Sequence, residues 1–135
     1  MTLCDTGPLV ALVDADDVHH ARCLAALPTL SGPLLTTWPC LTEAMHFLGK
    51  ARGWDAQAAL WQFVRRGALQ LHAPSSQAEI RIEELMAQYR DTPMDLADAS
   101  LVAAAEELNQ RRIFTLDKHF YAYRIHDQHA FEIIP

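Results

Sequence analysis

The sequence lacks the features of membrane, secreted and disulfide-rich proteins. No apolar run in its 135 residues approaches the ~20 residues that a membrane-spanning helix needs, so no membrane partner is expected. The first residues carry an acid at Asp5 and no basic segment, which argues against a secretory signal and favours the cytoplasm. Cys4, Cys23 and Cys40 are few, odd in number and without metal-site spacing, so we expect small buried side chains in a reducing compartment.

Linker-like segments are also missing. The longest stretch of proline, glycine and serine is only a few residues, and no internal repeat or low-complexity tract is found. The length fits one compact unit with a single core, so we expect a single domain over residues 1–135. Basic charge is scarce as well, because the net charge is −6. Taken alone, this argues against nucleic acid or an anionic membrane as partner, unless the negative charge gathers at one place.

Short apolar segments alternate with longer helical ones along the chain. The expected strands are Thr2–Cys4, Leu34–Thr36, Leu69–Leu71, Ile113–Leu116 and Phe131–Ile134. The expected helices follow Asp5, start near His19, follow Thr37, and cover Trp54–Arg66, Gln77–Tyr89 and the segment after Asp95. This alternation predicts an α/β fold with a mostly parallel sheet and helices on both faces.

The segment Met94–Leu101 places two acids three residues apart at a helix start, directly after Pro93. Ala97, Leu101, Ala104 and Leu108 form one apolar stripe, with Ser100, Ala103 and Glu107 on the other side. Asp95 suits the N-cap, and Asp98 suits the positive end of the helix. Capping alone would explain both acids, so their meaning depends on the other acids of the chain.

Carboxylates from four segments are expected to meet at one edge of the sheet. Asp5 ends the first strand, and Asp117 ends the strand that begins at Ile113. Glu43 lies early in the helix after Leu34–Thr36, and Asp98 lies in the first turn of its own helix. Ligands of open α/β sheets bind at the carboxyl ends of the strands. Clustered carboxylates repel one another, and Mg²⁺ or Mn²⁺ relieves that repulsion through oxygen coordination.

An ordered set of motifs resembles a known family. The motifs are Leu3-Cys4-Asp5-Thr6-Gly7, Leu41-Thr42-Glu43, Asp95-Leu96-Ala97-Asp98-Ala99 and Thr115-Leu116-Asp117-Lys118-His119-Phe120. Together they are similar to PIN domains, above all to VapC-type toxin ribonucleases, over essentially the whole chain. The resemblance implies a three-layer α/β/α sandwich, a Mg²⁺- or Mn²⁺-dependent endoribonuclease, an inhibitory antitoxin partner and a homodimer.

The resemblance also assigns roles to residues. It implies Asp5, Glu43, Asp98 and Asp117 as the catalytic, metal-binding quartet. Asp95 takes a secondary catalytic role, as an N-cap with outer contact to the metal. Thr6 and Thr115 resemble hydroxyls that form hydrogen bonds near such a site.

The implied reaction is hydrolysis of RNA by metal-activated water, with Glu43 assisting proton removal. Two bound divalent ions would offset four negative charges of the chain. Lys118, directly after Asp117, is a candidate phosphate-binding residue. A basic rim was expected from Lys118 together with Lys50, Arg52, Arg65, Arg66, Arg111 and Arg112.

Alternative readings remain open. A phospho-acceptor signalling domain also combines an α/β sheet, clustered acids and Mg²⁺, but Cys4-Asp5 is not an acid pair and the Leu69–Leu71 strand is followed by His72. A non-catalytic scaffold of the same fold would bind partners only. The histidines, including His119 near the site mouth, lack zinc-site spacing. Trp38, Trp54 and Trp61 could stack on RNA bases, but their helical positions favour the core.

Overall fold

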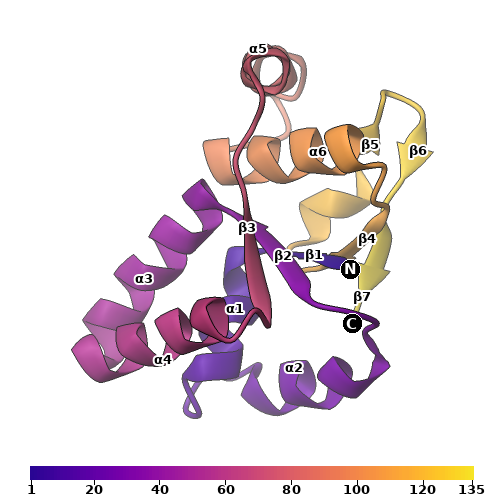
Figure 1. Ribbon diagram of the computed structural model, residues 1–135. Coiled ribbons are helices and arrows are strands. Elements are labelled where there is room, and N and C mark those ends of the chain that lie inside the picture. The colour runs from indigo at the N-terminus through magenta and orange to yellow at the C-terminus, as the bar shows by residue number, and fades with distance from the viewer.

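A parallel sheet forms the centre of the protein, as the computed structural model of residues 1–135 shows (Figure 1). Its five strands follow the order β3-β2-β1-β4-β7, so the first strand of the chain lies in the middle. The strands span Thr2–Cys4 (β1), Leu34–Thr37 (β2), Leu69–His72 (β3), Arg112–Phe114 (β4) and Glu132–Ile134 (β7). Each lies within two residues of its expected bounds, and all neighbouring pairs are parallel.

Helices cover both faces of this sheet. They span Thr6–Val13 (α1), His20–Ala26 (α2), Trp38–Arg52 (α3), Trp54–Arg65 (α4), Ser76–Gln88 (α5) and Leu96–Leu108 (α6), with 3₁₀ turns at Leu27–Thr29 (η1) and Lys118–Tyr121 (η2). Helices α1 to α4 supply most of one core, while α5, α6 and the C-terminal segments supply the other. The predicted three-layer α/β/α sandwich is therefore confirmed. No helix is both long and apolar enough to cross a lipid bilayer.

Consecutive residues of the central strands contribute to opposite cores. In β1, Leu3 belongs to the core beneath α6, whereas Cys4 belongs to the core beneath α1 and α3. In β4, Ile113 and Phe114 divide in the same way. Strands that are covered on both faces need apolar side chains at every position, which explains their short unbroken apolar runs. All three cysteines are fully buried and free, as expected from the sequence.

Helix α6 is more deeply buried than its sequence pattern indicated. Nine consecutive residues, from Ala97 to Ala105, are buried. The expected polar side at Ser100 and Ala103 is wrong, because α5 packs over α6 while α6 also contacts the sheet (Figure 1). The expected end of the apolar stripe is also wrong, since Leu108 is 40% exposed.

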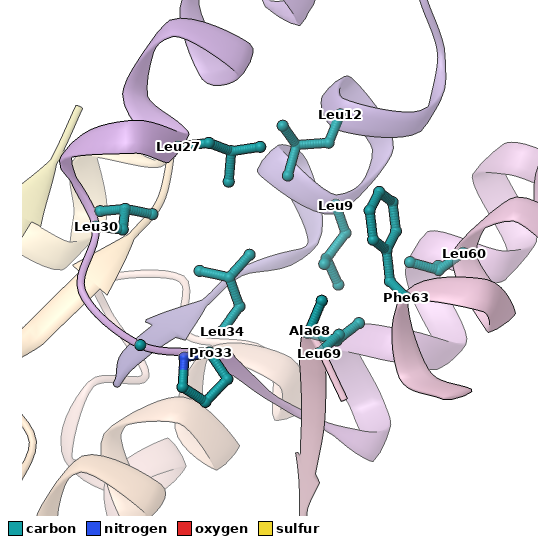
Figure 2. Close-up of a pocket in the computed structure, with 11 residues that line it drawn as sticks. Leu9, Leu12, Leu27, Leu30, Pro33, Leu34, Leu60, Phe63, Ala68 and Leu69 are labelled. Carbon is teal, nitrogen blue, oxygen red and sulfur yellow. The ribbon is translucent and has the colours of Figure 1, made fainter. Parts of the chain in front are cut away.

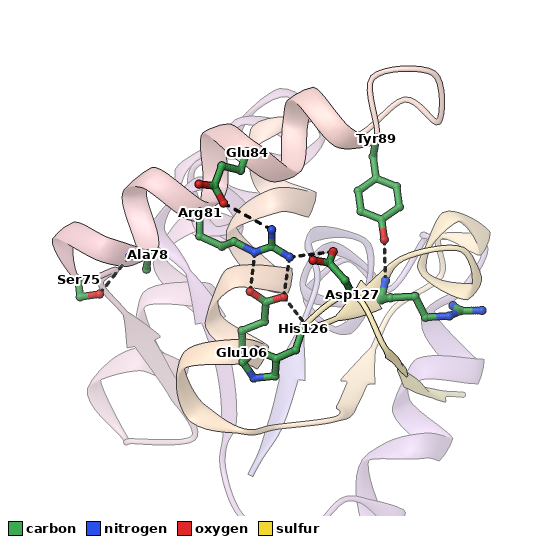
Figure 3. Close-up of polar contacts among 9 residues, drawn as sticks. Ser75, Ala78, Arg81, Glu84, Tyr89, Glu106, His126 and Asp127 are labelled. Carbon is green, nitrogen blue, oxygen red and sulfur yellow. Dashed lines mark hydrogen bonds and ion pairs between the residues drawn. The ribbon is translucent and has the colours of Figure 1, made fainter.

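A short antiparallel hairpin near the C-terminus was not anticipated. It pairs Arg124–Ile125 (β5) with His129–Ala130 (β6). His126 and Asp127 in its turn both have positive φ, although the turn lacks the Asn-Gly or Asp-Gly signal of common hairpins. Arg81 of α5 stabilises the turn from outside the hairpin, because its guanidinium binds both Glu106 of α6 and Asp127 of the turn (Figure 3).

The core beneath α1 contains an apolar cavity of about 200 Å³ (Figure 2). Its wall includes Leu9 and Leu12 of α1, Leu27 and Leu30 around η1, Leu60 and Phe63 of α4, and the residues that lead into β2 and β3. No acidic or basic side chain lines it. The cavity is therefore distinct from the acidic crevice described below, which has a different set of lining residues.

Candidate active site

Three carboxylates meet at the carboxyl ends of the two central strands. Asp5 follows β1, Asp117 lies three residues after β4, and Asp98 lies in the first turn of α6. One carboxylate oxygen from each residue lies within 4.8 Å of the other two. Parallel pairing of β1 with β4 places two of these acids side by side, and the start of α6 at the same edge supplies the third. The structure therefore brings together three residues of the quartet.

Hydrogen bonds hold Asp5 in one orientation. The Thr6 backbone N–H donates to Oδ1 at 2.7 Å, and the Thr115 hydroxyl donates to Oδ2 at 2.8 Å. The Thr115 oxygen also accepts the Asp117 N–H at 3.0 Å, so Thr115 links two members of the cluster. Burial raises the pKa of Asp5, the Thr115 and Thr6 contacts lower it, and the nearby acids raise it further. The Thr6 hydroxyl, which also lies in the crevice, donates to the carbonyl of Cys40 at 3.3 Å.

Asp98 is fixed by a reciprocal cap and by a tyrosine. Its N–H donates to Asp95 Oδ1 at 2.8 Å, while its own Oδ2 accepts the Asp95 N–H at 3.3 Å. The Tyr123 hydroxyl lies 3.3 Å from the same Oδ2. Burial, followed by repulsion from Asp95, raises the pKa of Asp98 to about 7. Asp95 is thus the N-cap that the sequence indicated, and its carboxylate creates part of the repulsion at the site.

A crevice of about 630 Å³ surrounds these acids. Glu43 and Asp95 line it together with the three clustered carboxylates, but neither belongs to the cluster itself. Burial, followed by the charges of Asp95 and Asp5, raises the pKa of Glu43. The expected fourth member of the quartet therefore lies in the wall of the crevice, where a carboxylate with a raised pKa is a good proton acceptor.

The chemistry of the cluster fits a hard divalent cation. Its donors are all carboxylate oxygens, without the cysteine or histidine ligands that favour zinc. The raised pKa values of Asp5 and Asp98 show that uncompensated negative charge is costly there. Mg²⁺ and Mn²⁺ accept such oxygen donors and retain water at their remaining positions.

Several crevice residues were not found from the sequence. Asp14, Asp17 and His19 line the crevice, and Tyr123 reaches Asp98 from the C-terminal segment. The sequence placed His19 only near the start of a helix, and no motif marks Asp14 or Asp17. These residues line the crevice because the segment after α1 passes beside it. Local periodicity does not predict that path. By contrast, His119 lies near the site as expected, with Nδ1 2.9 Å from Asp117 Oδ1.

The expected basic residues do not form the wall of the crevice, because no lysine or arginine lines it. Arg112 lies at the opposite end of β4 and pairs with Glu132, while Arg52 pairs with Asp14 and Asp16. Arg65 is the last residue of α4 and Arg66 is its C-cap, while Arg111 binds the carbonyl of Ala130. Lys118 is exposed in the turn after Asp117.

The core assignment of the tryptophans is also wrong for two of them. Trp38 is 48% exposed and Trp54 is 66% exposed, whereas Trp61 packs against the core. Both exposed rings begin a helix, at its first residue. Trp61, by contrast, lies inside α4 and is partly buried.

Comparison with known proteins gives consistent relatives. The PIN domain family model matches residues 2–125. Ribonuclease VapC26 of Mycobacterium tuberculosis is 30% identical over 135 residues, covering 98% of this chain and 99% of the relative. Among solved structures, Mycobacterium tuberculosis VapC20, described as a sarcin–ricin loop cleaving toxin, has a TM-score of 0.83 at 18% identity and covers 90% of this chain and 94% of its own.

Two further structural neighbours are toxin–antitoxin assemblies. A complex from Klebsiella pneumoniae has a TM-score of 0.70 at 17% identity, covering 90% of this chain and 91% of that chain. VapBC2 of Rickettsia felis, bound to a promoter DNA fragment, has a TM-score of 0.67 at 13% identity, covering 99% and 98%. The structural matches agree with the observed fold, and the family model spans most of the sequence. The chain belongs to the PIN domain family, in its VapC branch.

Proposed function

We propose that this chain is a Mg²⁺- or Mn²⁺-dependent endoribonuclease and the toxin of a toxin–antitoxin pair. The observation that carries the proposal is the cluster of Asp5, Asp98 and Asp117, whose carboxylate oxygens lie within 4.8 Å of one another in an open crevice. The relatives support RNA as substrate, since VapC26 is named a ribonuclease and VapC20 a toxin that cleaves the sarcin–ricin loop.

Each acid has a task in this proposal. Asp5, Asp98 and Asp117 would hold the ion, with Thr115 and the reciprocal cap fixing their orientations. When bound, a divalent ion lowers the pKa of a coordinated water and offsets charge on a phosphate. Glu43 in the crevice wall would accept a proton from the attacking water, helped by its raised pKa.

The products test the reaction. Attack by water requires no 2′-hydroxyl, so the fragments should carry 5′-phosphate and 3′-hydroxyl ends. Purified protein is incubated with total RNA and Mg²⁺ or Mn²⁺, with and without excess EDTA, and the ends are identified by mass spectrometry. Fragments with 2′,3′-cyclic phosphate, or full cleavage in EDTA, would contradict the proposal.

Two other functions were considered from the sequence. A phospho-acceptor domain would require Asp5, Asp98 or Asp117 to become phosphorylated, and the family match gives no support for that reading. A non-catalytic scaffold would bind metal at the same cluster but leave RNA intact. The cleavage assay, run on the wild type and on Asp98→Asn, decides between the scaffold and the nuclease: a nuclease cleaves RNA only as the wild type, whereas a scaffold cleaves it in neither form.

The proposed partners are a small antitoxin and a second copy of this chain. Seven acids and no lysine or arginine line the crevice, so an antitoxin arginine could bind there bidentately. The apolar cavity of Figure 2 lies along another face of α1. Apolar side chains of the antitoxin segment that carries this arginine could bind there. For the homodimer, helices from the first half of the chain and the region 77–89 are the proposed interface, and exposed Ile80 on α5 supports the second of these. Co-purification from the native operon should return a stoichiometric small protein.

A further inference from the structure

A second groove opens from the acidic crevice. It is lined by Trp38, Pro39, Thr42, Glu43, Asp95, Leu96 and Ala97, and its volume is about 490 Å³. Glu43 and Asp95 also line the acidic crevice, so the two hollows share a wall. Two large apolar side chains face solvent here, because Trp38 is 48% exposed and Leu96 is 51% exposed. A molecule held at the three clustered acids could therefore extend directly into this groove.

The backbone holds Trp38 firmly. It is the first residue of α3, between the N-cap Thr37 and Pro39, and its carbonyl accepts the Thr42 hydroxyl at 2.8 Å. Leu96 is likewise the first residue of α6, directly after the N-cap Asp95. The backbone that carries both apolar side chains is therefore already fixed, so a ligand need order only the side chains themselves.

The charges of the groove restrict its occupant. Glu43 and Asp95 are its only ionisable lining residues, and no cation is present to attract a phosphate. Asp95 uses Oδ1 to cap α6, and its Oδ2 forms no hydrogen bond within the protein. A planar, uncharged group with N–H donors suits such a groove, since it can stack on indole and donate to a carboxylate.

We propose that this groove binds one unpaired nucleobase of the RNA, stacked on Trp38 beside Leu96, next to the phosphate positioned at the acidic cluster. The inference rests on the proposed ribonuclease function and adds a feature of the substrate: an RNA segment whose base is free to leave its own stack. Paired RNA would have to open before it could bind, so single-stranded regions and loops are the expected targets.

Binding is measured with Ca²⁺ in place of Mg²⁺, using a fluorescently labelled single-stranded RNA and a gel check that it stays uncut. Trp38→Ala should weaken the RNA affinity between about fivefold and about 150-fold, the range of one lost base–aromatic stack. Trp38→Phe should retain most of the affinity, because it keeps a ring. Trp54→Ala is the matched control, since Trp54 is 66% exposed but lines neither the crevice nor the groove, and it should bind like the wild type.

An abasic nucleotide moved along the RNA tests the stack itself. An abasic nucleotide at one position near the cleavage site should weaken RNA binding by the wild type. The same abasic RNA should bind Trp38→Ala no more weakly than the intact RNA does. Equal losses in both proteins, or unchanged affinity for Trp38→Ala, would refute the subsite while leaving RNA cleavage intact. Trp38-dependent binding without cleavage in Mg²⁺ would instead refute the nuclease and retain the subsite.

Two other results would also overturn the inference. Absence of RNA binding by the wild type would contradict both the proposed base subsite and the proposed nuclease function. A Trp38→Ala protein that binds RNA normally but loses self-association in sedimentation would show that a second copy of the chain covers the groove.

Discussion

The hydroxyl of Tyr123 lies 3.3 Å from Oδ2 of Asp98, although 25 residues separate the two in the sequence. The Tyr123 side chain is fully buried, and its ring makes edge contacts with Tyr89 and Phe120 at centroid distances of 5.1 Å and 5.0 Å. Burial and the neighbouring carboxylates raise the pKa of Tyr123, so the hydroxyl stays protonated and donates. The C-terminal segment thus positions an acid at the start of α6.

Replacing Tyr123 by phenylalanine tests this positioning. The Tyr123→Phe variant keeps the ring packing and removes one hydrogen bond to a carboxylate, so the free energy of unfolding should fall by only about 1 kcal/mol. Loss of a group that orients a metal ligand should weaken Mn²⁺ binding about 10- to 100-fold. Calorimetric titration and urea unfolding measure the two effects. An unchanged Mn²⁺ affinity would show that Tyr123 supports only the core.

The raised pKa of Asp98 predicts how pH affects the metal-free protein. Because burial raises its pKa from 3.8 to about 7, the folded state binds more protons than the unfolded state between these values. This contribution to stability is fully present below pH ~4 and is lost as pH rises through about 7. In EDTA, the wild type should therefore melt at a higher temperature at pH 5 than at pH 8. The difference should shrink in Asp98→Asn.

Removing a clustered charge should separate stability from activity. Asn at Asp5 or Asp98 should abolish cleavage, because a metal-binding carboxylate is lost. Without metal, the melting temperature should stay the same or rise, since repulsion among the acids is relieved. Thermal melts with and without Mn²⁺ check this, and Mn²⁺ should stabilise only the wild type. A variant that unfolds more easily without metal would contradict the charge argument.

The sequence predicted the parts of this site that local patterns encode. Asp5 and Asp117 follow apolar strands, and Asp95 caps a helix, so their places at one sheet edge follow from parallel topology. Strand bounds were also close, because fully covered strands are short apolar runs. The order of the acids identified the family, while the spacing alone did not show that Glu43 lies outside the cluster.

Other features depend on packing that no local pattern records. Ser100 is buried because it faces the end of β2, where its hydroxyl lies 2.6 Å from that of Thr37, a residue far away in the sequence. The β5–β6 hairpin lacks a turn signal and is held from outside by Arg81. Trp38 is the first residue of α3 and is half exposed, whereas Trp61 lies inside α4 and contacts the core. The groove beside Trp38 is completed by the start of α6, a segment far along the chain that no local pattern places there.

Arg81 and Glu106 together should anchor the hairpin, since Arg81 binds Asp127 and Glu106 accepts the His126 N–H (Figure 3). Arg81 Nε and Nη2 bind the two Glu106 oxygens at 2.8 Å and 3.1 Å, and Nη2 also reaches Asp127 at 3.1 Å. The Glu106 side chain is only 8% exposed, so Arg81→Ala leaves a poorly solvated carboxylate without a cation and with only the His126 N–H as partner. A loss of about 1–3 kcal/mol in unfolding free energy is expected.

A double-mutant cycle separates pairing from packing. Arg81→Ala with Glu106→Gln should lose less than the sum of the single variants, because neither charge is then left alone. Arg81 also contacts exposed Glu84 at 3.6 Å, and Glu84→Gln is the control with little expected effect. Additive losses in the cycle would show that Arg81 acts mainly through its aliphatic stem.

Metal and antitoxin should compete for the same carboxylates. An arginine placed among Asp5, Asp98 and Asp117 would offset part of their charge and occupy the position between their carboxylates where an ion would bind. With the antitoxin identified by co-purification, raising Mn²⁺ should therefore weaken its binding, and by linkage the antitoxin should weaken Mn²⁺ binding by the same factor. Replacing the crevice-binding arginine of the antitoxin by methionine should remove this dependence while apolar contacts maintain some affinity. An antitoxin affinity that is independent of Mn²⁺ would place the inhibitory contact outside the acidic cluster.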